Sequence, residues 1–283
     1  SSNPKPVIDS APVGATKNAD QTHTFSVAAS NFSPFGYQWR KDGNGISGAT
    51  NSAYTLNALR VTDGGSYSVV VNNAYGSVTS SIVTLTVNKA TPTISAAPTA
   101  SGITYGQTLS SSTLTGGSAS VAGTFAFTSP STAPNAGTAS QGVTFTPTDT
   151  ANFNTTTTTV SVAVGKATPT ISAAPTASGI TYGQTLVNST LTGGSASAAG
   201  TFAFTTPSTA PNAGTASHGV TFTPTDAANF NTTTTTVSVA VGKATPTISA
   251  APTASGITYG QTLASSTLTG GSASAAGTFA FTT

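Results

Sequence analysis

The sequence contains no cysteine and no methionine, and all six of its acidic residues are aspartate. No disulfide can therefore stabilise the fold, and packing and hydrogen bonds have to do so. Charged residues are only 5% of the 283 residues, and the eight lysines and arginines are scattered. A nucleic-acid partner or an anionic membrane surface thus has no electrostatic basis. The sequence has no apolar run near the roughly 20 residues that a membrane-spanning helix needs, so we predict no membrane insertion.

The residues that are abundant favour strands. Hydrophobic residues make up 36% of the chain, more than a disordered chain usually carries, and Thr, Ser, Gly and Asn supply most of the rest. Thr and Val are β-branched and fit a pleated, half-buried surface. Apolar residues alternate with polar ones over short runs, which is the period of a strand. The sequence therefore predicts an all-β protein.

A repeat of 77 residues is the main feature of the chain. The motif Lys89-Ala-Thr-Pro-Thr-Ile-Ser95 returns at Lys166 and at Lys243, and residues 89–165 differ from residues 166–242 at six positions. Such near-identity indicates one stable unit used repeatedly, which serves spacing better than catalysis. We predict a first module at 1–88, repeats at 89–165 and 166–242, and an incomplete third copy at 243–283.

Within one repeat, turn residues separate short alternating runs. Alternation is clear around Phe125 and Phe127, at Val143 and Phe145, and along Val160 to Val164. Six or seven such strands in each repeat predict a sandwich of two sheets. We expect the run Thr155 to Thr159 to begin the last strand, with Thr155, Thr157 and Thr159 facing solvent.

The first module carries a different pattern, with strands expected at 24–30, 35–40, 53–56, 66–71 and 78–87. Its Trp39 and its Asp63-Gly-Gly65-Ser-Tyr67 segment resemble an immunoglobulin domain of the intermediate (I-set) type. The resemblance implies that Trp39 packs at the centre of the sandwich and that Asp63 and Tyr67 form the tyrosine corner. The family's two bridged cysteines would fall near Val27 and at Val69, so we expect two valines to fill that space.

The repeats resemble the bacterial immunoglobulin-like repeats called MBG or Big domains. The matching segments are Ile103-Thr-Tyr-Gly106, Asn135-Ala-Gly-Thr138 and Val143-Thr-Phe-Thr-Pro-Thr-Asp149. The resemblance implies an extracellular or cell-surface location in a large bacterial protein, often an adhesin. The junctions at 87–92 and 164–169 are short and contain proline, so we expect stiff connections and a linear, rod-like array of sandwiches.

Few residues are candidates for chemistry. The two histidines are His23 and His218, and the sister repeat has Gln141 where His218 stands. No Gly-x-Ser-x-Gly segment stands between a strand and a helix, so we predict neither an enzyme nor a cofactor site. Asp149 lies near two asparagines, Asn152 and Asn154. We expect it to cap a turn rather than to hold a cation, and we predict no metal.

A sharper hypothesis concerns Lys89, Asp149 and Asn154, with Lys166, Asp226 and Asn231 as their counterparts in the second repeat. If the first and last strands of a repeat run side by side in parallel, Lys89 lies near Asn154. Some bacterial surface domains join such a pair through an isopeptide bond, which an intact mass one ammonia lower per repeat would reveal. We expect a surface ion pair between Lys89 and Asp149 instead.

Carbohydrate binding is the main alternative to a spacing role, because it commonly uses exposed aromatic side chains. Tyr105, Tyr182 and Tyr259 recur at one position of the repeat, and Tyr54 and Tyr75 are candidates in the first module. Packing in a core or at a junction is the simpler interpretation of each. The partner in this alternative is a glycan or another surface ligand.

The third copy has no counterpart of residues 130–165. Six of its apolar side chains would then lack partners: Ile248, Ile257, Tyr259, Leu263, Phe279 and Phe281. We expect the natural chain to continue, as the absence of a signal peptide at Ser1 also indicates an excerpt or a processed protein. The alternative is that another copy of the chain supplies strands by edge pairing and builds a fibre.

These observations predict a structural extender in an extracellular adhesin or fibre, whose partners are its own neighbouring modules. The first alternative is a module that binds carbohydrate or protein through its loops. The second is an accessory region of a secreted enzyme. Exposed, clustered aromatic residues would favour the first alternative, and a catalytic domain elsewhere in the gene product would favour the second.

Overall fold

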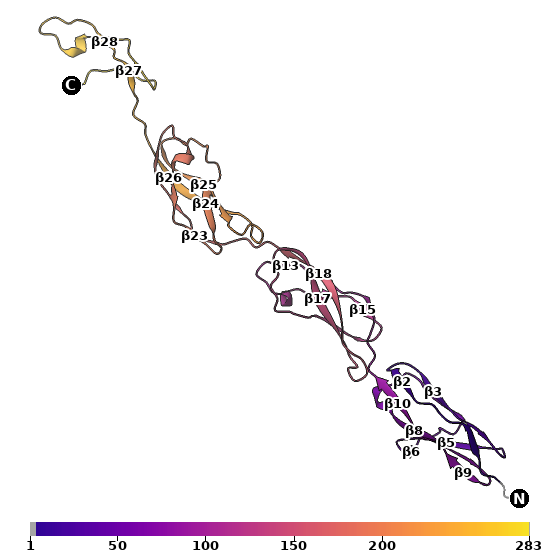
Figure 1. Ribbon diagram of the computed structural model, residues 1–283. Coiled ribbons are helices and arrows are strands. Elements are labelled where there is room, and N and C mark those ends of the chain that lie inside the picture. Colours follow the sequence, from indigo (N-terminus) through magenta and orange to yellow (C-terminus); the bar gives the residue numbers. More distant parts are fainter. Residues whose placement is uncertain (1–3, 283) are drawn as a thin grey trace. The chain divides into compact units, whose positions relative to one another are not determined.

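The computed structural model describes residues 4–282, and strands make up its regular structure, with helical turns of three residues between them (Figure 1). The predicted all-β fold is confirmed, and its strands are grouped in repeated units. None of the described helical turns is long and apolar enough to cross a membrane. The chain divides into two compact units, Ser1–Gly165 and Lys166–Thr283.

The first module is a sandwich of two layers. One layer is a sheet in the order β2-β10-β8-β5-β6, with β9 also paired to β8, and the other holds the pairs β1-β4 and β3-β7. β2 runs parallel to β10, and the remaining pairs of the module are antiparallel. The elements are β1 (Val7–Ser10), β2 (Ala15–Asn18), β3 (His23–Ser26), β4 (Ala28–Ser30), β5 (Gly36–Lys41), β6 (Asn44–Gly45), β7 (Ala53–Leu56), η1 (Val61–Asp63), β8 (Gly65–Asn73), β9 (Gly76–Thr79) and β10 (Val83–Asn88).

The core of this module is built around Trp39, which is fully buried and donates a hydrogen bond from Nε1 to the Asn51 carbonyl at 2.9 Å. Val27 and Val69 are buried in the same cluster, so apolar contact occupies the place where the resemblance puts a disulfide. The Tyr67 hydroxyl donates to the Asp63 carbonyl at 2.7 Å, which ties the end of η1 to β8. Burial, with smaller contributions from Tyr54 and Asp63, raises the pKa of Tyr67 to about 12, so this hydroxyl keeps its proton.

Two of the strands expected in this module are interrupted. The expected strand at 24–30 is two strands, because β3 pairs with β7 whereas β4 pairs with β1. The expected strand at 78–87 breaks into β9 and β10 at Ser80. The Ser80 hydroxyl accepts a hydrogen bond from the Val69 N–H and donates one to the Ser81 carbonyl, so a side chain takes a place in the ladder. Hydrophobic alternation alone carries no signal for either break.

The first repeat has a four-stranded sheet in the order β13-β18-β17-β16 and two short ladders, β11-β15 and β12-β14. β13 pairs in parallel with the last strand, β18, whereas the first strand of the repeat, β11, pairs with β15 in the antiparallel direction. Thr155, Thr157 and Thr159 are exposed, as predicted. The elements are β11 (Ile94–Ala96), β12 (Thr99–Ala100), β13 (Ile103–Thr104), η2 (Leu109–Ser111), β14 (Leu114–Thr115), β15 (Ser118–Ala119), β16 (Gly123–Phe127), β17 (Gly137–Pro147) and β18 (Thr156–Gly165).

In the second unit, the complete repeat has the same sheets and its own core cluster, which includes Leu186, Val220 and Val239. Its elements are β19 (Ile171–Ala173), β20 (Thr176–Ala177), β21 (Ile180–Thr181), η3 (Leu186–Asn188), β22 (Leu191–Thr192), β23 (Ser195–Ala196), β24 (Gly200–Phe204), β25 (Gly214–Pro224) and β26 (Thr233–Gly242). The third copy forms only the two short ladders, from β27 (Ile248–Ala250), β28 (Thr253–Ala254), η4 (Leu263–Ser265), β29 (Leu268–Thr269) and β30 (Ser272–Ala273).

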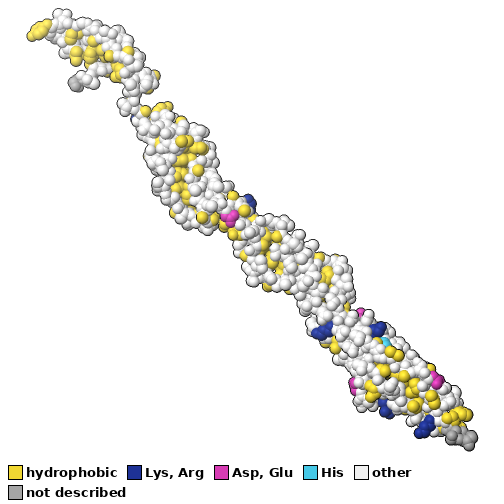
Figure 2. Space-filling model, in the orientation of Figure 1, with side chains coloured by type: hydrophobic (Ala, Val, Ile, Leu, Met, Phe, Trp, Pro, Cys, Tyr) yellow, Lys and Arg dark blue, Asp and Glu magenta, His cyan; other side chains and the backbone are white. Residues whose placement is uncertain are grey.

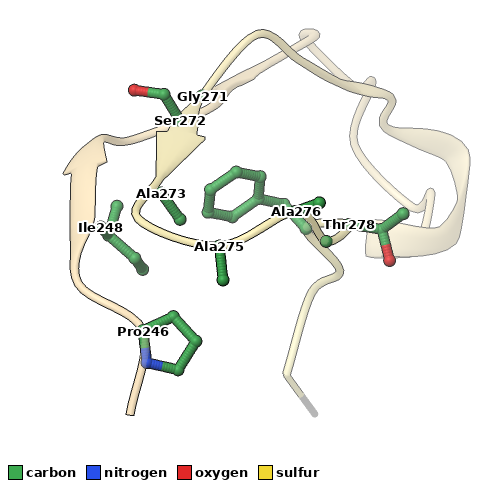
Figure 3. Close-up of a pocket in the computed structure, with 10 residues that line it drawn as sticks. Pro246, Ile248, Gly271, Ser272, Ala273, Ala275, Ala276 and Thr278 are labelled. Atoms are coloured by element: carbon green, nitrogen blue, oxygen red, sulfur yellow. The ribbon is translucent and has the colours of Figure 1, made fainter. Parts of the chain in front are cut away.

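The described part of the third copy exposes the residues that its sister copies bury. Leu263 is 51% exposed, whereas its counterpart Leu186 is fully buried, and Ile257 is 41% exposed against 7% for Ile180. Ile248, Tyr259 and Phe281 are also exposed, as predicted, whereas Phe279 is half-buried. The third copy also has a cleft of about 530 Å³, lined by Pro246, Ile248 and Phe279 among others (Figure 3).

We predict that residues 207–242, copied after Thr283, close this face, because the same sequence covers it in the second repeat. Limited proteolysis should remove residues beyond about Lys243 from the chain 1–283 and spare the extended chain. Binding of a hydrophobic dye should fall with the extension. A chain of 283 residues that already resists the protease at these sites would contradict the prediction.

His23 is a half-buried titratable group in the first module. Its ring packs edge-on against Phe25, with 4.4 Å between centroids, and its Nε2 is buried without a hydrogen-bond partner. Burial lowers the pKa of His23 below its ordinary value, and the charge of Lys17 lowers it further. The unfolded chain therefore binds more protons than the folded chain as the pH falls through about 6.5. The free energy of unfolding of the first module is therefore higher above about pH 6.5, where His23 is neutral in both states, and falls below that pH as the unfolded chain takes up the proton.

We predict that His23→Gln reduces the loss of stability between pH 7.5 and pH 5.5. Glutamine keeps a polar side chain of similar size and does not titrate. The fluorescence of Trp39, the single tryptophan, follows unfolding of this module in urea at each pH. An equal drop in midpoint for both proteins would show that another group causes the pH dependence.

Candidate functional site

The few charged residues of each complete repeat lie close together at the point where the chain enters it. In the face shown, lysine, arginine and aspartate side chains are concentrated on the first module, and the repeats are nearly free of them (Figure 2). Each complete repeat has one lysine and one aspartate, which are Lys89 and Asp149 in the first. Lys89 begins the repeat and Asp149 lies in the turn before β18. A parallel bridge between Ala90 and Phe153 brings the two segments together. The charges of the repeat therefore lie where the chain enters it.

The turn before β18 is held by its own side chains. The Asn152 N–H donates to Asp149 Oδ1 at 3.2 Å, and Asn152 Nδ2 donates to Asp149 Oδ2 at 2.8 Å. These hydrogen bonds from Asn152, and then the Arg60 guanidinium, lower the pKa of Asp149 below its ordinary value. Asp149 is therefore ionised at neutral pH, and it caps the turn as the sequence predicts.

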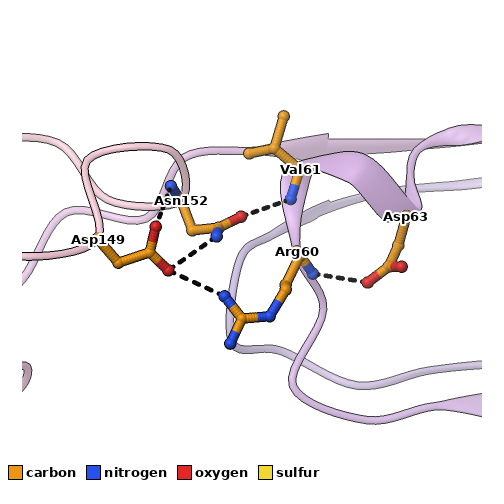
Figure 4. Close-up of polar contacts among 5 residues, drawn as sticks. All are labelled: Arg60, Val61, Asp63, Asp149 and Asn152. Carbon is orange, nitrogen blue, oxygen red and sulfur yellow. Dashed lines mark hydrogen bonds and ion pairs between the residues drawn. The ribbon is translucent and has the colours of Figure 1, made fainter.

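The first module docks on this turn through two hydrogen bonds (Figure 4). Arg60 Nη1 donates to Asp149 Oδ2 at 2.9 Å, and the Val61 N–H donates to Asn152 Oδ1 at 2.8 Å. Asp63 positions this segment, because its carboxylate accepts a hydrogen bond from the Arg60 N–H at 2.8 Å. The Asp149 carboxylate thus binds a side chain of the neighbouring module, and the Asn152 carboxamide binds a backbone N–H of the same module.

The amide contributes more to this contact than the ion pair. The side chains of Arg60 and Asp149 are 64% and 38% exposed, so water screens their attraction. Asn152 is only 7% exposed, and its bond to the Val61 N–H is partly buried. A hydrogen bond in such a setting contributes about 0.5–1.5 kcal/mol, and its loss leaves a donor without a partner. Asn152 is therefore the anchor of the junction.

The entering chain is bonded to the same turn. The Ala90 N–H donates to the Asn152 carbonyl at 2.9 Å, and the Asn154 N–H donates to the Ala90 carbonyl at 2.8 Å. β10 ends at Asn88, so a single residue separates the last strand of the first module from this bridge. The connection between the first module and the first repeat is therefore part of the hydrogen-bonded structure.

The predicted ion pair between Lys89 and Asp149 is wrong. Lys89 Nζ donates instead to the Thr150 carbonyl at 2.7 Å, one residue beyond the carboxylate. Asp149 is paired with Arg60 from the preceding module, which the sequence pattern of the repeat alone does not show. Asn154 Nδ2 donates to Thr91 Oγ1 at 3.3 Å. The isopeptide bond between Lys89 and Asn154 stays a hypothesis, which the intact mass of the chain tests.

The second repeat builds the same turn. Asn229 Nδ2 donates to Asp226 Oδ2 at 2.8 Å, and Lys166 Nζ donates to the Ala227 carbonyl at 2.6 Å. Asn231 Nδ2 donates to Thr168 Oγ1 at 3.3 Å, as Asn154 does to Thr91. The turn and its bonds to the entering chain are thus properties of every complete repeat, to which Arg60 and Val61 add a neighbour-specific contact.

The remaining candidates are dispersed. His218 lies in β25 with its Nε2 buried and without a hydrogen-bond partner. Tyr105 packs against the core of its repeat, whereas Tyr182 is 54% exposed and Tyr259 fully exposed. Tyr54 stacks on Trp39 at 6.3 Å between centroids. Among residues 4–282, no group of three or more His, Cys, Asp or Glu side chains is placed to hold a metal ion.

Comparison with known proteins finds a related segment and similar folds. No family model matches the chain. A stretch of 97 residues, 33% of this chain, is 37% identical to Endoglucanase C of Cellulomonas fimi, and it spans only 9% of that enzyme. An I-band fragment from titin is 12% identical, covers 84% of this chain and 99% of its own, and has a TM-score of 0.34. The tandem immunoglobulin repeats of Dlar are 20% identical over 29% of this chain and 48% of theirs, with a TM-score of 0.28.

We predict that Asn152→Ala, a change in the first repeat, destabilises the first module. The variant removes the acceptor of the Val61 N–H and a partner of Asp149, so we expect a loss of about 1–2 kcal/mol. Trp39 fluorescence reports the first module alone, and its urea midpoint should fall by about 0.5–1 M.

Asn229→Ala is the matched control, because it makes the same change in the second repeat. It should leave the Trp39 midpoint unchanged. Equal effects of the two variants, or no effect of either, would mean that the junction contact does not stabilise the first module.

Proposed function

We propose that this chain is a non-catalytic accessory region of a secreted, multidomain enzyme that acts on a polysaccharide. In this proposal, its modules hold other domains of that enzyme apart. The supporting observation is the 97-residue segment that is 37% identical to part of Endoglucanase C. Because that segment is a small part of the endoglucanase, it supports an accessory role and leaves catalysis to domains outside it.

The junction supports a spacing role for the modules. A spacer transmits distance only when its connections resist bending, and flexible linkers lose that property. The chain that enters the first repeat is bonded at Ala90, and Asn152 binds the preceding module at Val61. The first module and the first repeat are thus linked by hydrogen bonds as well as by the chain.

The second candidate is an extender in a bacterial surface adhesin or extracellular fibre. The near-identity of residues 89–165 and 166–242 favours it, because repetition of one unit sets length and little else. Both candidates place the chain outside the cell and use it as a spacer. They differ in what the modules separate.

An antibody raised against residues 89–242 distinguishes the two candidates in the source organism. For the enzyme, the antibody should capture a larger protein from the culture medium, and the captured protein should hydrolyse carboxymethyl cellulose or another soluble polysaccharide. Capture from the cell-wall fraction, without hydrolysis of any polysaccharide tested, would favour the adhesin.

We predict that the spacing modules unfold one at a time under force. A complete repeat of 77 residues should lengthen the chain by roughly 210–240 Å, which is its extended length at about 3.3–3.6 Å per residue less a folded length of about 40 Å. Two equal steps of this size and one somewhat longer step from the first module are expected in single-molecule stretching. Gradual extension without such steps would contradict independent sandwiches and, with them, the spacing role.

A further inference from the structure

Two exposed aromatic rings, Phe32 and Tyr75, meet on the surface of the first module. Phe32 is 57% exposed and Tyr75 is 43% exposed, and their centroids are 5.6 Å apart with planes at 74°. Phe32 lies in the loop between β4 and β5, and Tyr75 lies in the turn between β8 and β9. The two rings come from different loops and form a corner on the surface.

The backbone beneath these rings is held in place by one side chain. Asn73 Nδ2 donates to the carbonyls of Asn31 and Phe32 at 3.1 and 3.3 Å, and Asn73 Oδ1 accepts from the Tyr75 N–H at 2.9 Å. Its carboxamide therefore joins both loops. Gly36 adds to this close approach, because a Cβ there would lie 3.1 Å from Cγ of Asn72. The backbone that carries both rings is thus held by hydrogen bonds within the module.

The loop also adopts an unfavourable backbone conformation. Asn31 and Phe32 have φ angles of +72° and +54°, and the left-handed region is unusual for a bulky residue such as phenylalanine. Such conformations persist where surrounding contacts impose them, and they cluster at binding sites. Here the conformation directs an apolar ring to the surface, where burial gives it no compensating stabilisation.

From these observations we propose that Phe32 and Tyr75 form a binding platform for a neutral polysaccharide. The apolar C–H faces of sugar rings stack on aromatic faces, and two rings at an angle contact both a face and an edge of one sugar. Asn31, which precedes Phe32, is exposed and supplies a carboxamide of the kind that bonds sugar hydroxyls. Charge is balanced there, with Lys5 against Gly76 and Asp9 bonded to Ser30, which favours an uncharged ligand.

The size of the surface favours a glycan over a protein. A phenylalanine or tyrosine buries about 150–250 Å² when fully covered, so two half-exposed rings offer about 200 Å². A stable protein interface needs about 800 Å² from each partner. A sugar polymer needs only a few such contacts, because the strand presents the same face repeatedly and rebinding adds avidity.

The test measures partition of the full chain onto microcrystalline cellulose and onto insoluble xylan. We expect binding that 0.5 M sodium chloride does not abolish, because the platform and these ligands are uncharged. Phe32→Ala and Tyr75→Ala should each lower the partition coefficient at least about fivefold. Tyr182→Ala, which removes an exposed tyrosine in the second unit, should leave it unchanged.

Two further variants separate stacking from general hydrophobic contact. Phe32→Leu keeps apolar area and loses the ring, so it should bind as weakly as Phe32→Ala, whereas Tyr75→Phe should retain most binding. The Trp39 urea midpoint verifies that each variant is folded. The proposal is overturned if the wild type binds neither polysaccharide, if Phe32→Leu binds normally, or if Tyr182→Ala weakens binding equally. It is independent of the spacing role, which the stretching experiment tests separately.

Discussion

The bridge between the entering chain and the turn before the last strand is the interaction on which each complete repeat depends. Ala90 exchanges two backbone hydrogen bonds with Asn152 and Asn154, and Ala167 does the same with Asn229 and Asn231. These bonds join residues about 60 positions apart in the sequence and so close the repeat at its entrance. They also remove any free linker between β10 and the first repeat. In the first repeat, the hydrogen bonds that close the module also hold the chain that arrives from the first module.

The scarcity of charge gives this arrangement its specificity. The faces of the sandwiches are covered by threonine, serine and glycine, which interact with water and carry no charge. A repeat that has one lysine and one aspartate keeps both at its entrance, where Lys89 holds a carbonyl and Asp149 orients Asn152. The neighbour is then recognised by Asn152 through hydrogen bonds of fixed direction. Arg60 adds an exposed ion pair that water weakens.

The third copy shows which parts of the fold form from local sequence and which need the later strands of the repeat. Its short ladders form with the same pairing as in the complete repeats, so local sequence is enough to build them. Ile257 and Leu263 nevertheless stay exposed, because the strands that cover their counterparts lie later in the repeat. The hydrophobic interior of this fold is therefore made by contacts between distant segments, and the local hairpins alone leave it open.

Much of the fold could be predicted from residue patterns. Alternation located the long strands around Phe145 and Val162, and the motif around Trp39 and Tyr67 indicated the core of the first module. The breaks at Val27 and Ser80 could not be predicted, because each arises from a change of pairing partner or from a side chain in the ladder. Arg60 was missed as a partner of Asp149 for a similar reason, since 89 residues separate them. The corner of Phe32 and Tyr75 also joins loops with no shared pattern.

The sequence by itself determined the class of fold, the repeat and its length, the absence of disulfides and the position of the few charges. These properties depend on composition and on the alternation of neighbouring residues, which act over a few positions of the chain. Tertiary structure alone decided which charge meets which, which amide anchors the junction and which aromatic rings remain at the surface. Those outcomes depend on distances between segments that only the packing of the two sheets brings together.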